Sequence, residues 1–489
     1  MKKIIVFSMC AIVALVSCQK SGDLNSSENG NKMMVMAAID NGGQTKTTAQ
    51  DEGDVTKVLW SDDDAFAMSV KGGDFAKFVL TSGAGSQVGT FEVEGIVTEG
   101  VSTGYVAYYP YQEGIIYADG QLNVNFPAVQ SYVVGSIAAA PMVAVSETEN
   151  LKFFNVASLL KITLKGEAVI RTITLTGNND ETLAGAAEVA VGLSPVLSLA
   201  GAADSKVITL DCGEGVALTD DGVDFYFALP AITFDGGFTI KATDVTGAYM
   251  IKSTDSEVIL SASKVKVYPV FDYVPEWEEV SSEDELNAAI ADGGLVKLAE
   301  DIVLTNYIDI TTEVVLDLNG YTLSHPSTSP ATYKDVIEVR TGGRLTINGE
   351  GEVIAEDGYS IYAAGDAVVN INGGYYFSWV TAIDARKDAQ VTINNGVFEV
   401  DGSTNPDGDF GQVFTLNLRD KKNSYVTDKS NIIVKGGEFY NYNPSASMSE
   451  NPIADFVAPG YRVVNKESGV DMTEPHDASG EDIWYKVVK

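Results

Sequence analysis

Short apolar runs separated by turn residues dominate residues 33–272, which show no sustained helical period. Clear examples are residues 104–109, 159–164 and 224–229, each lying close to Gly, Asp or Pro. Many short strands at such spacing predict an all-β sandwich architecture. Because 240 residues is long for one sandwich, we divide the region near Asn155. We expect two β-sandwich domains, one over residues 33–155 and one over residues 156–272.

Residues 281–489 contain an internal repeat built on isoleucine. Two isoleucines lie ten residues apart in each unit, and successive units are 24 and 22 residues apart, a spacing typical of solenoids. The three pairs are Ile337 and Ile347, Ile361 and Ile371, and Ile383 and Ile393. Alternating apolar and polar neighbours indicate strands, and the pattern predicts a right-handed parallel β-helix of about six coils with equivalent isoleucines stacked. A leucine-rich repeat fits poorly because the required leucine spacing is missing.

The corners of this repeat carry Asn and Gly, which tolerate the left-handed backbone that a sharp turn needs. Asn348, Asn372 and Asn394 follow the second isoleucine of each unit and could hydrogen-bond from coil to coil. Ahead of the repeat, residues 273–280 are expected to form a linker. Ser282 and Glu285 then have capping-box spacing and predict a short helix that covers the open end of the β-helix.

The N-terminus has the pattern of an export signal. A basic start precedes an apolar run over residues 4–17, too short for a permanent membrane span but suited to a secretory signal. The run ends in Leu-Val-Ser-Cys, which resembles a bacterial lipobox with Cys18 as the lipidated residue. We expect a lipoprotein signal peptide over 1–17 and a flexible tether over 18–32. An ordinary signal peptide with an incidental cysteine is the alternative.

Composition narrows the possible partners. With 32 Lys and Arg against 68 Asp and Glu, the net charge of −36 argues against nucleic acid and against charge-driven docking on anionic lipid. Two histidines and three cysteines exclude most Cys/His metal cages. Cys212 has no disulfide partner once Cys18 is lipidated. The lipid on Cys18 is the only covalent group that we expect, and we predict no cofactor.

Several motifs in the first half of the chain resemble Bacteroidales fimbrillin-type proteins. They lie at residues 58–64, 109–111, 155–162, 225–230, 238–244 and 265–270. The resemblance implies two transthyretin-like sandwiches, lipoprotein export to the outer membrane and a place among pilus subunits or their surface-anchored relatives. Polymerising fimbrillins are typically trimmed by an arginine-specific protease near the mature N-terminus, but no arginine precedes Arg171 here. An anchor, a tip or a stand-alone lipoprotein is therefore favoured over a shaft subunit.

Residues 315–323 resemble pectin-lyase-like β-helices, some of which cleave acidic polysaccharides. Stacking the repeats places Glu338, Tyr362 and Asp384 in one outward column, with Arg340 and Arg386 in another. The two carboxylates would be about 9–10 Å apart, near the upper limit for an inverting glycosidase. An outer face with ordinary solvated charges is the alternative. We assign no catalytic residue because no compact acid, base and calcium cluster emerges.

Aromatic residues suggest a ligand platform for sugar rings. Its candidates are Tyr375, Tyr376, Trp379, Tyr440 and Tyr442. Phe398 and Phe439 occupy places equivalent to that of Tyr376. Facing inward, Phe398 and Phe439 would instead be a stacked core ladder, which burial favours.

A loop rich in oxygen ligands offers a weak calcium candidate at Asp401, Asp407 and Asp409, with a turn-rich excursion as the alternative. Taken together, the sequence predicts a non-enzymatic, lipid-anchored surface protein. It would display the β-helix to a glycan, a host surface protein or fimbrial subunits. The alternative is a polysaccharide-active or glycan-capturing outer-membrane lipoprotein.

Overall fold

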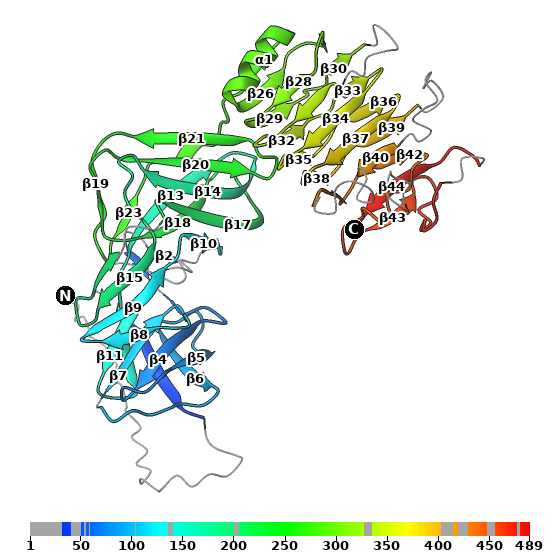
Figure 1. Cartoon of the computed structure of the whole chain (residues 1–489). Coiled ribbons are helices and arrows are strands. Elements are labelled where there is room, and N and C mark those ends of the chain that lie inside the picture. Colours follow the sequence, from blue (N-terminus) through cyan, green and yellow to red (C-terminus); the bar gives the residue numbers. More distant parts are fainter. Residues whose placement is uncertain are drawn as a thin grey trace, which may run out of the picture.

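The computed structural model describes residues 32–40, 50–52, 55–57, 59–102, 104–134, 140–199, 205–326, 335–401, 414–418, 429–446, 455–476 and 480–489. The described chain is all-β apart from the helix α1 (Glu283–Asp292), as the sequence predicts. Figure 1 shows two β-rich units in series, followed by a long stack of strands that ends at the C-terminus. No helix in these described ranges is long and apolar enough to cross a membrane.

Seven strands of the first unit close into a barrel in the order β1-β12-β11-β7-β4-β5-β6. Their bounds are β1 (Met34–Ile39), β4 (Ala65–Val70), β5 (Phe75–Ser82), β6 (Val88–Glu94), β7 (Tyr105–Tyr109), β11 (Met142–Ser146) and β12 (Asn150–Asn155). A separate hairpin joins β2 (Gln50–Glu52) and β3 (Val55–Lys57). Trp60 fills the barrel, packs edge-on against Phe91 and Phe153, and donates its indole N–H to the Ala37 carbonyl at 3.1 Å.

The second unit contains three further sheets and a two-stranded pair. The five-stranded sheet comprises β10 (Val129–Ser131), β17 (Val207–Ala217), β14 (Val169–Gly177), β20 (Phe238–Asp244) and β21 (Tyr249–Thr254). A second sheet comprises β18 (Val223–Leu229), β13 (Ser158–Lys165), β23 (Val265–Val267) and β24 (Phe271–Asp272). A third comprises β16 (Val196–Leu199), β15 (Gly185–Ala190), β9 (Gln121–Phe126) and β8 (Ile116–Ala118), and β19 (Thr233–Phe234) pairs with β22 (Val258–Ile259).

The sequence placed the boundary between the two units near Asn155. In the structure, the chain enters the second unit before that residue. Strands β8, β9 and β10 precede that residue but belong to sheets of the second unit, whereas β11 and β12 return to the barrel. Residues 116–131 therefore belong to the sheets of the second unit, although they lie within the range expected for the first domain. The local apolar pattern cannot reveal this pairing, because it identifies a strand without identifying the strand's partner. The assignment of both units as transthyretin-like sandwiches stays a prediction.

Residues 278–488 form three sheets that the chain visits in turn, here called the C-terminal stack. The first sheet is β25 (Glu278–Val280), β26 (Gly294–Leu298), β29 (Glu313–Asp317), β32 (Arg344–Asn348), β35 (Val368–Ile371), β38 (Gln390–Ile393) and β41 (Asn431–Val434). The second is β27 (Ile302–Val303), β30 (Thr322–His325), β33 (Glu352–Ala355), β36 (Tyr375–Ser378), β39 (Val397–Val400), β42 (Glu438–Tyr440), β44 (Trp484–Val488) and β43 (Arg462–Asn465). The third is β28 (Ile308–Ile310), β31 (Ile337–Val339), β34 (Tyr359–Ala364), β37 (Thr381–Arg386) and β40 (Phe414–Leu418).

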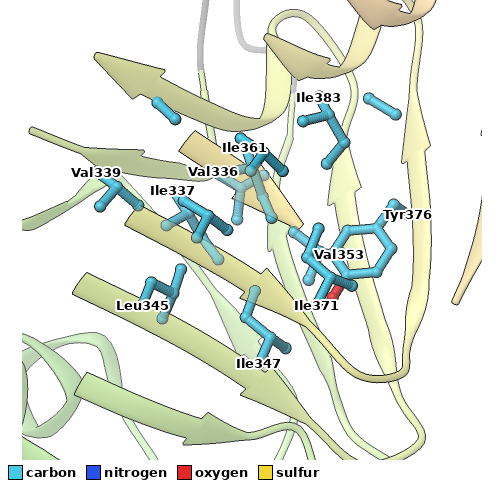
Figure 2. Close-up of a cluster of buried hydrophobic side chains, with 14 of the residues drawn as sticks. Val336, Ile337, Val339, Leu345, Ile347, Val353, Ile361, Ile371, Tyr376 and Ile383 are labelled. Atoms are coloured by element: carbon cyan, nitrogen blue, oxygen red, sulfur yellow. The ribbon is translucent and has the colours of Figure 1, made fainter. Parts of the chain in front are cut away.

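Parallel pairing within the stack confirms the predicted isoleucine columns. Ile347 lies beside Ile371, and Ile371 beside Ile393, in the first sheet. The third sheet stacks the other isoleucine of each repeat in the same way, in the order Ile337, Ile361 and Ile383. All six side chains are fully buried. Figure 2 shows that the isoleucines it labels meet in the interior between the sheets. The second sheet supplies a further strand per coil that the sequence pattern did not identify.

The two ends of the stack are closed differently. At the N-terminal end, Ser282 caps α1 by accepting a hydrogen bond from the Glu285 N–H at 3.3 Å. Leu286, Ala289 and Ile290 are buried against the stack, so the predicted capping helix is confirmed. At the other end, β44 pairs antiparallel with both β42 and β43.

The expected linker over residues 273–280 is largely structured. Its last three residues form β25, the first strand of the first stack sheet. Its first residue, Tyr273, is buried in the second unit and donates its hydroxyl to the Ala248 carbonyl at 2.7 Å. The stack therefore begins at residue 278, three residues before the boundary expected from the sequence.

Candidate functional site

The outer face of the third stack sheet gathers acidic, basic and aromatic side chains. Strand register places Glu338 beside Tyr362 and Tyr362 beside Asp384, as the repeat spacing predicts. Arg386 lies in the neighbouring column, beside Ala364. We call Asp309, Glu338, Arg340, Tyr362, Asp384 and Arg386 the acid–arginine face.

Each arginine of this face pairs with the carboxylate two residues before it in the sequence. Arg340 Nε donates to Glu338 Oε2 at 2.8 Å and lies 3.4 Å from Asp309 Oδ1. Arg386 pairs with Asp384, a carboxylate that is fully buried, and its guanidinium lies 4.5 Å from the centre of the Tyr362 ring. These contacts neutralise most of the charge, so the face is a network of matched pairs.

Asp335 is a titratable neighbour of the acid–arginine face that the sequence did not single out. Burial, followed by the charges of Glu338 and Asp384, raises the pKa of its carboxyl to about 7. A 2.9 Å hydrogen bond from the Tyr359 N–H opposes that rise. The residue precedes the β31 strand and lies outside the repeated positions, so no periodic signal marks it.

The outer face of the second stack sheet is aromatic. Tyr375 and Phe377 alternate outward on β36, with nearly parallel rings whose centres are 6.5 Å apart, and the Tyr375 hydroxyl donates to Glu399 Oε2 at 2.8 Å. Tyr440 and Trp484 pack together on the last strands with ring centres 5.1 Å apart. We call these four residues the aromatic surface. Phe377 and Trp484 were missed in the sequence because apolar side chains were expected inside.

Two of the five platform candidates lie in the interior. Tyr376 is fully buried and stacks on Phe398, which in turn stacks on Phe439, with 5.0 Å between ring centres in each pair. The stacked pair of Phe398 and Phe439 is the core ladder that the sequence offered as the alternative, and Tyr376 extends it. Tyr442 is also buried and donates its hydroxyl to the Leu416 carbonyl at 3.0 Å. Strand alternation explains the correction, because Tyr375 and Tyr376 are adjacent and only one can face outward.

The remaining three platform candidates are compatible with an exposed surface. Tyr375 and Tyr440 belong to the aromatic surface, and both are partly exposed. Trp379 follows β36 directly and is likewise partly exposed, with its backbone N–H donating to the Ala355 carbonyl at 3.3 Å. Three of the five candidates are therefore partly exposed, and Phe377 and Trp484 lie beside two of them.

The calcium and lipidation sites lie mostly outside the described residues. Asp407, Asp409 and Cys18 fall there, and so does the expected signal peptide; Asp401 alone is described, at the end of β39. Within the described ranges no group of three His, Cys, Asp or Glu residues is placed to hold a metal ion. Cys212 is buried, and burial raises the pKa of its thiol to about 12.

Comparison with known proteins gives only distant structural similarities. No protein-family profile matches the chain, and no curated protein matches it. A proposed cell adhesion protein from Bacteroides ovatus is 10% identical, with a TM-score of 0.33 over 50% of this chain and 96% of that one. A proposed cell adhesion protein from Bacteroides fragilis is 10% identical, with a TM-score of 0.26 over 48% of this chain and 91% of that one.

A fimbrial protein from Bacteroides ovatus is 12% identical, with a TM-score of 0.23 over 50% of this chain and 51% of that one. Identities and TM-scores of this size do not assign the chain to a family.

Proposed function

We propose that the chain is a lipid-anchored cell-surface protein without enzymatic activity, which uses its C-terminal stack to bind a glycan or a protein. The stack would be a right-handed parallel β-helix, and the first two units would be a stalk or a module that docks fimbrial subunits. Cys18, in its lipobox-like sequence, would carry the anchor in the outer membrane.

The observation that carries the proposal is the aromatic surface on the second stack sheet. Tyr375 and Phe377 present neighbouring rings on one rigid strand, and Tyr440 and Trp484 continue the surface two coils further. Aromatic faces gain free energy when they cover the apolar face of a sugar ring or an apolar side chain of a protein. Polar groups at the edge, such as Glu399 beside the Tyr375 hydroxyl, would fix the orientation of the bound ligand.

The test is a binding screen of the full chain against glycans and host surface proteins. We expect the double variant Tyr375→Ala with Phe377→Ala to lower the affinity for any ligand that binds the aromatic surface about tenfold or more. Each lost aromatic contact is worth about 1 kcal/mol or more. Tyr117→Ala is the matched control, since Tyr117 is an exposed tyrosine of the second unit with 38% exposure. Binding that survives the double variant with an intact fold would rule out the aromatic surface.

The anchor has its own test. Cys18→Ala in cells should move the protein out of the membrane fraction, because the lipid chains would be missing. Retention of this variant in washed membranes would show that another segment holds the protein there.

Polysaccharide cleavage is a second candidate function, favoured by the raised pKa of Asp335. A carboxyl with a pKa near 7 can donate a proton at neutral pH, and Glu338 and Asp384 contribute to its electrostatic environment. Incubation of the full chain with acidic polysaccharides would release reducing or unsaturated sugars, and Asp335→Asn would abolish that release. An unchanged polysaccharide would leave binding as the function.

A further inference from the structure

The second unit contacts the stack through the tip of one hairpin. Strands β20 and β21 form this hairpin, and Figure 1 shows its tip next to β32 and β35 of the stack. Asn348 Nδ2 donates to the Thr246 carbonyl at 2.9 Å across the contact. Gly247 lies beside Thr346, since a Cβ atom on Gly247 would be in ordinary van der Waals contact with the Thr346 methyl group, at 3.5 Å. The hairpin tip therefore contacts the stack directly and borders a space between the two units.

A cavity of about 350 Å³ lies beside this contact, and we call it the junction cleft. Its stack wall includes Thr346, Asn370 and Thr392, which occupy equivalent positions on β32, β35 and β38. Equivalent positions on adjacent parallel strands are about 4.8 Å apart, so the three side chains form a row about 10 Å long. Within the described part of the chain, none of these three side chains has a hydrogen-bond partner. The row therefore offers free hydroxyl and amide groups.

Two basic side chains line the same cleft. Arg171 enters from β14 and Lys435 from the corner after β41. Both are exposed, and neither forms an ion pair with any described residue. The lining contains one acidic residue, Asp244, whose carboxylate already accepts hydrogen bonds from the N–H and the hydroxyl of Thr246. In a chain of net charge −36, the cleft thus holds two basic side chains against one carboxylate and has a net positive lining.

The strand that carries Arg171 is irregular at this residue, and the irregularity changes the direction of the Arg171 side chain. Strand β14 pairs regularly with β17 and β20 except between Ile170 and Thr172, where both registers shift. Against β20, Arg171 is the extra residue of a β-bulge, because Ile170 pairs with Asp244 and Thr172 with Thr243. Against β17, the extra residues are 212–215 on β17 itself. Bulges turn a side chain away from the regular alternation and are frequent next to binding sites. This irregularity is a second observation, independent of the lining, that singles out Arg171.

Lys435 also breaks a pattern. The preceding coils place Asn348, Asn372 and Asn394 directly after the aligned buried residue, and these asparagines bond to one another at 2.8 Å. In the last coil the residue after Val434 is Lys435. A uniform ladder would continue with another asparagine, whereas the lysine adds a cation at the mouth of the cleft.

From these features we infer that the junction cleft binds an acidic sugar residue of a glycan. Arg171 and Lys435 contact the carboxylate or sulfate, since a guanidinium can bind such a group through two parallel hydrogen bonds. Thr346, Asn370 and Thr392 bind the ring hydroxyls, because each supplies a donor and an acceptor. This cleft is separate from the aromatic surface, so the inference does not depend on the aromatic residues.

The experiment is titration calorimetry on the full chain with a panel of oligosaccharides. The panel contains uronic-acid and sulfated oligosaccharides, the methyl esters of the uronic acids as uncharged analogues, and inorganic phosphate. We expect at least one acidic oligosaccharide to bind, and the methyl ester to bind about tenfold or more weakly. Arg171→Gln and Lys435→Gln should each weaken the acidic ligand about tenfold, because each removes a charge-assisted contact.

Lys252→Gln is the matched control, since it makes the same charge change on β21 away from the cleft and should leave affinity unchanged. Arg171→Lys keeps the charge but loses the paired hydrogen bonds, so it should fall between wild type and Arg171→Gln. Phosphate that binds as tightly as the sugar would refute recognition of the ring. Absence of binding by every acidic oligosaccharide, or full affinity in Arg171→Gln, would overturn the inference. The Tyr375→Ala and Phe377→Ala variant should retain this binding, which separates the two sites.

Discussion

Phe398→Ala should destabilise the C-terminal stack more than any change on its outer faces. Phe398 is fully buried between Tyr376 and Phe439, with ring centres 5.0 Å away on each side. Truncation of a buried phenylalanine costs about 3–5 kcal/mol, and this range includes the cavity that remains. Each coil contacts only its neighbours, so the lost packing energy weakens both interfaces of the coil that contains Phe398. The coils on either side of it are then less strongly coupled to each other.

Calorimetry of the full chain can measure this effect. For a folded unit of the size of the stack, 1 kcal/mol shifts Tm by about 2–4 °C, so the transition of the stack should fall by about 6–20 °C. Hydrogen exchange of peptides from β36, β39 and β42 identifies that transition, since protection should be lost there first. Phe377→Ala is the control, because Phe377 lies on the outer face of the adjacent strand β36. Equal losses in the two variants would refute the assignment of an interior ladder.

Three further outcomes are expected. Burial raises the pKa of Asp335 to about 7, so the folded state binds its proton more tightly than an unfolded aspartate with a pKa of about 3.9. The free energy of unfolding should therefore fall as pH rises from about 4 to about 7, and urea titrations should show that Asp335→Asn removes this component. Cys212, whose pKa is raised to about 12, should react slowly with iodoacetamide at pH 8 until the chain unfolds, as followed by mass. Asn372→Ala removes the middle of the asparagine ladder and should cost about 1–3 kcal/mol in urea denaturation, while exposed Asn123→Ala should cost almost nothing.

The sequence predicts the stack well wherever its signal is local and repeated. The ten-residue spacing of Ile337 and Ile347 recurs, and the two isoleucines lie on the third and first sheets as buried columns. The capping helix is predicted by Ser282 and Glu285, because a cap depends on residues close in sequence. The second sheet was not identified, since its strands contain outward apolar residues such as Ile354 and Phe377 that hide the alternation.

The candidate sites could be predicted from the sequence only where the direction of each side chain was assigned correctly. The column of Glu338, Tyr362 and Asp384 follows from register alone and is found in the structure. For the platform, five aromatic residues were grouped by their spacing from the corner, and this spacing does not distinguish the two faces of a strand. Assigning faces strand by strand would have separated Tyr375 from Tyr376, because the side-chain period of a strand is two.

The junction cleft shows why sites between units escape sequence analysis. The coil-to-coil bonds of the asparagines were predicted from their repeat and are present. The ladder's contact with the Thr246 carbonyl was not predicted, because it joins residues 102 positions apart that share no pattern. Arg171 was noted only as the first arginine of the chain, and the bulge that directs it is defined by its partner strands. A ligand that bridges Arg171 and Lys435 would bind both units at once, so its affinity should depend on the hairpin contact as well as on the two cations.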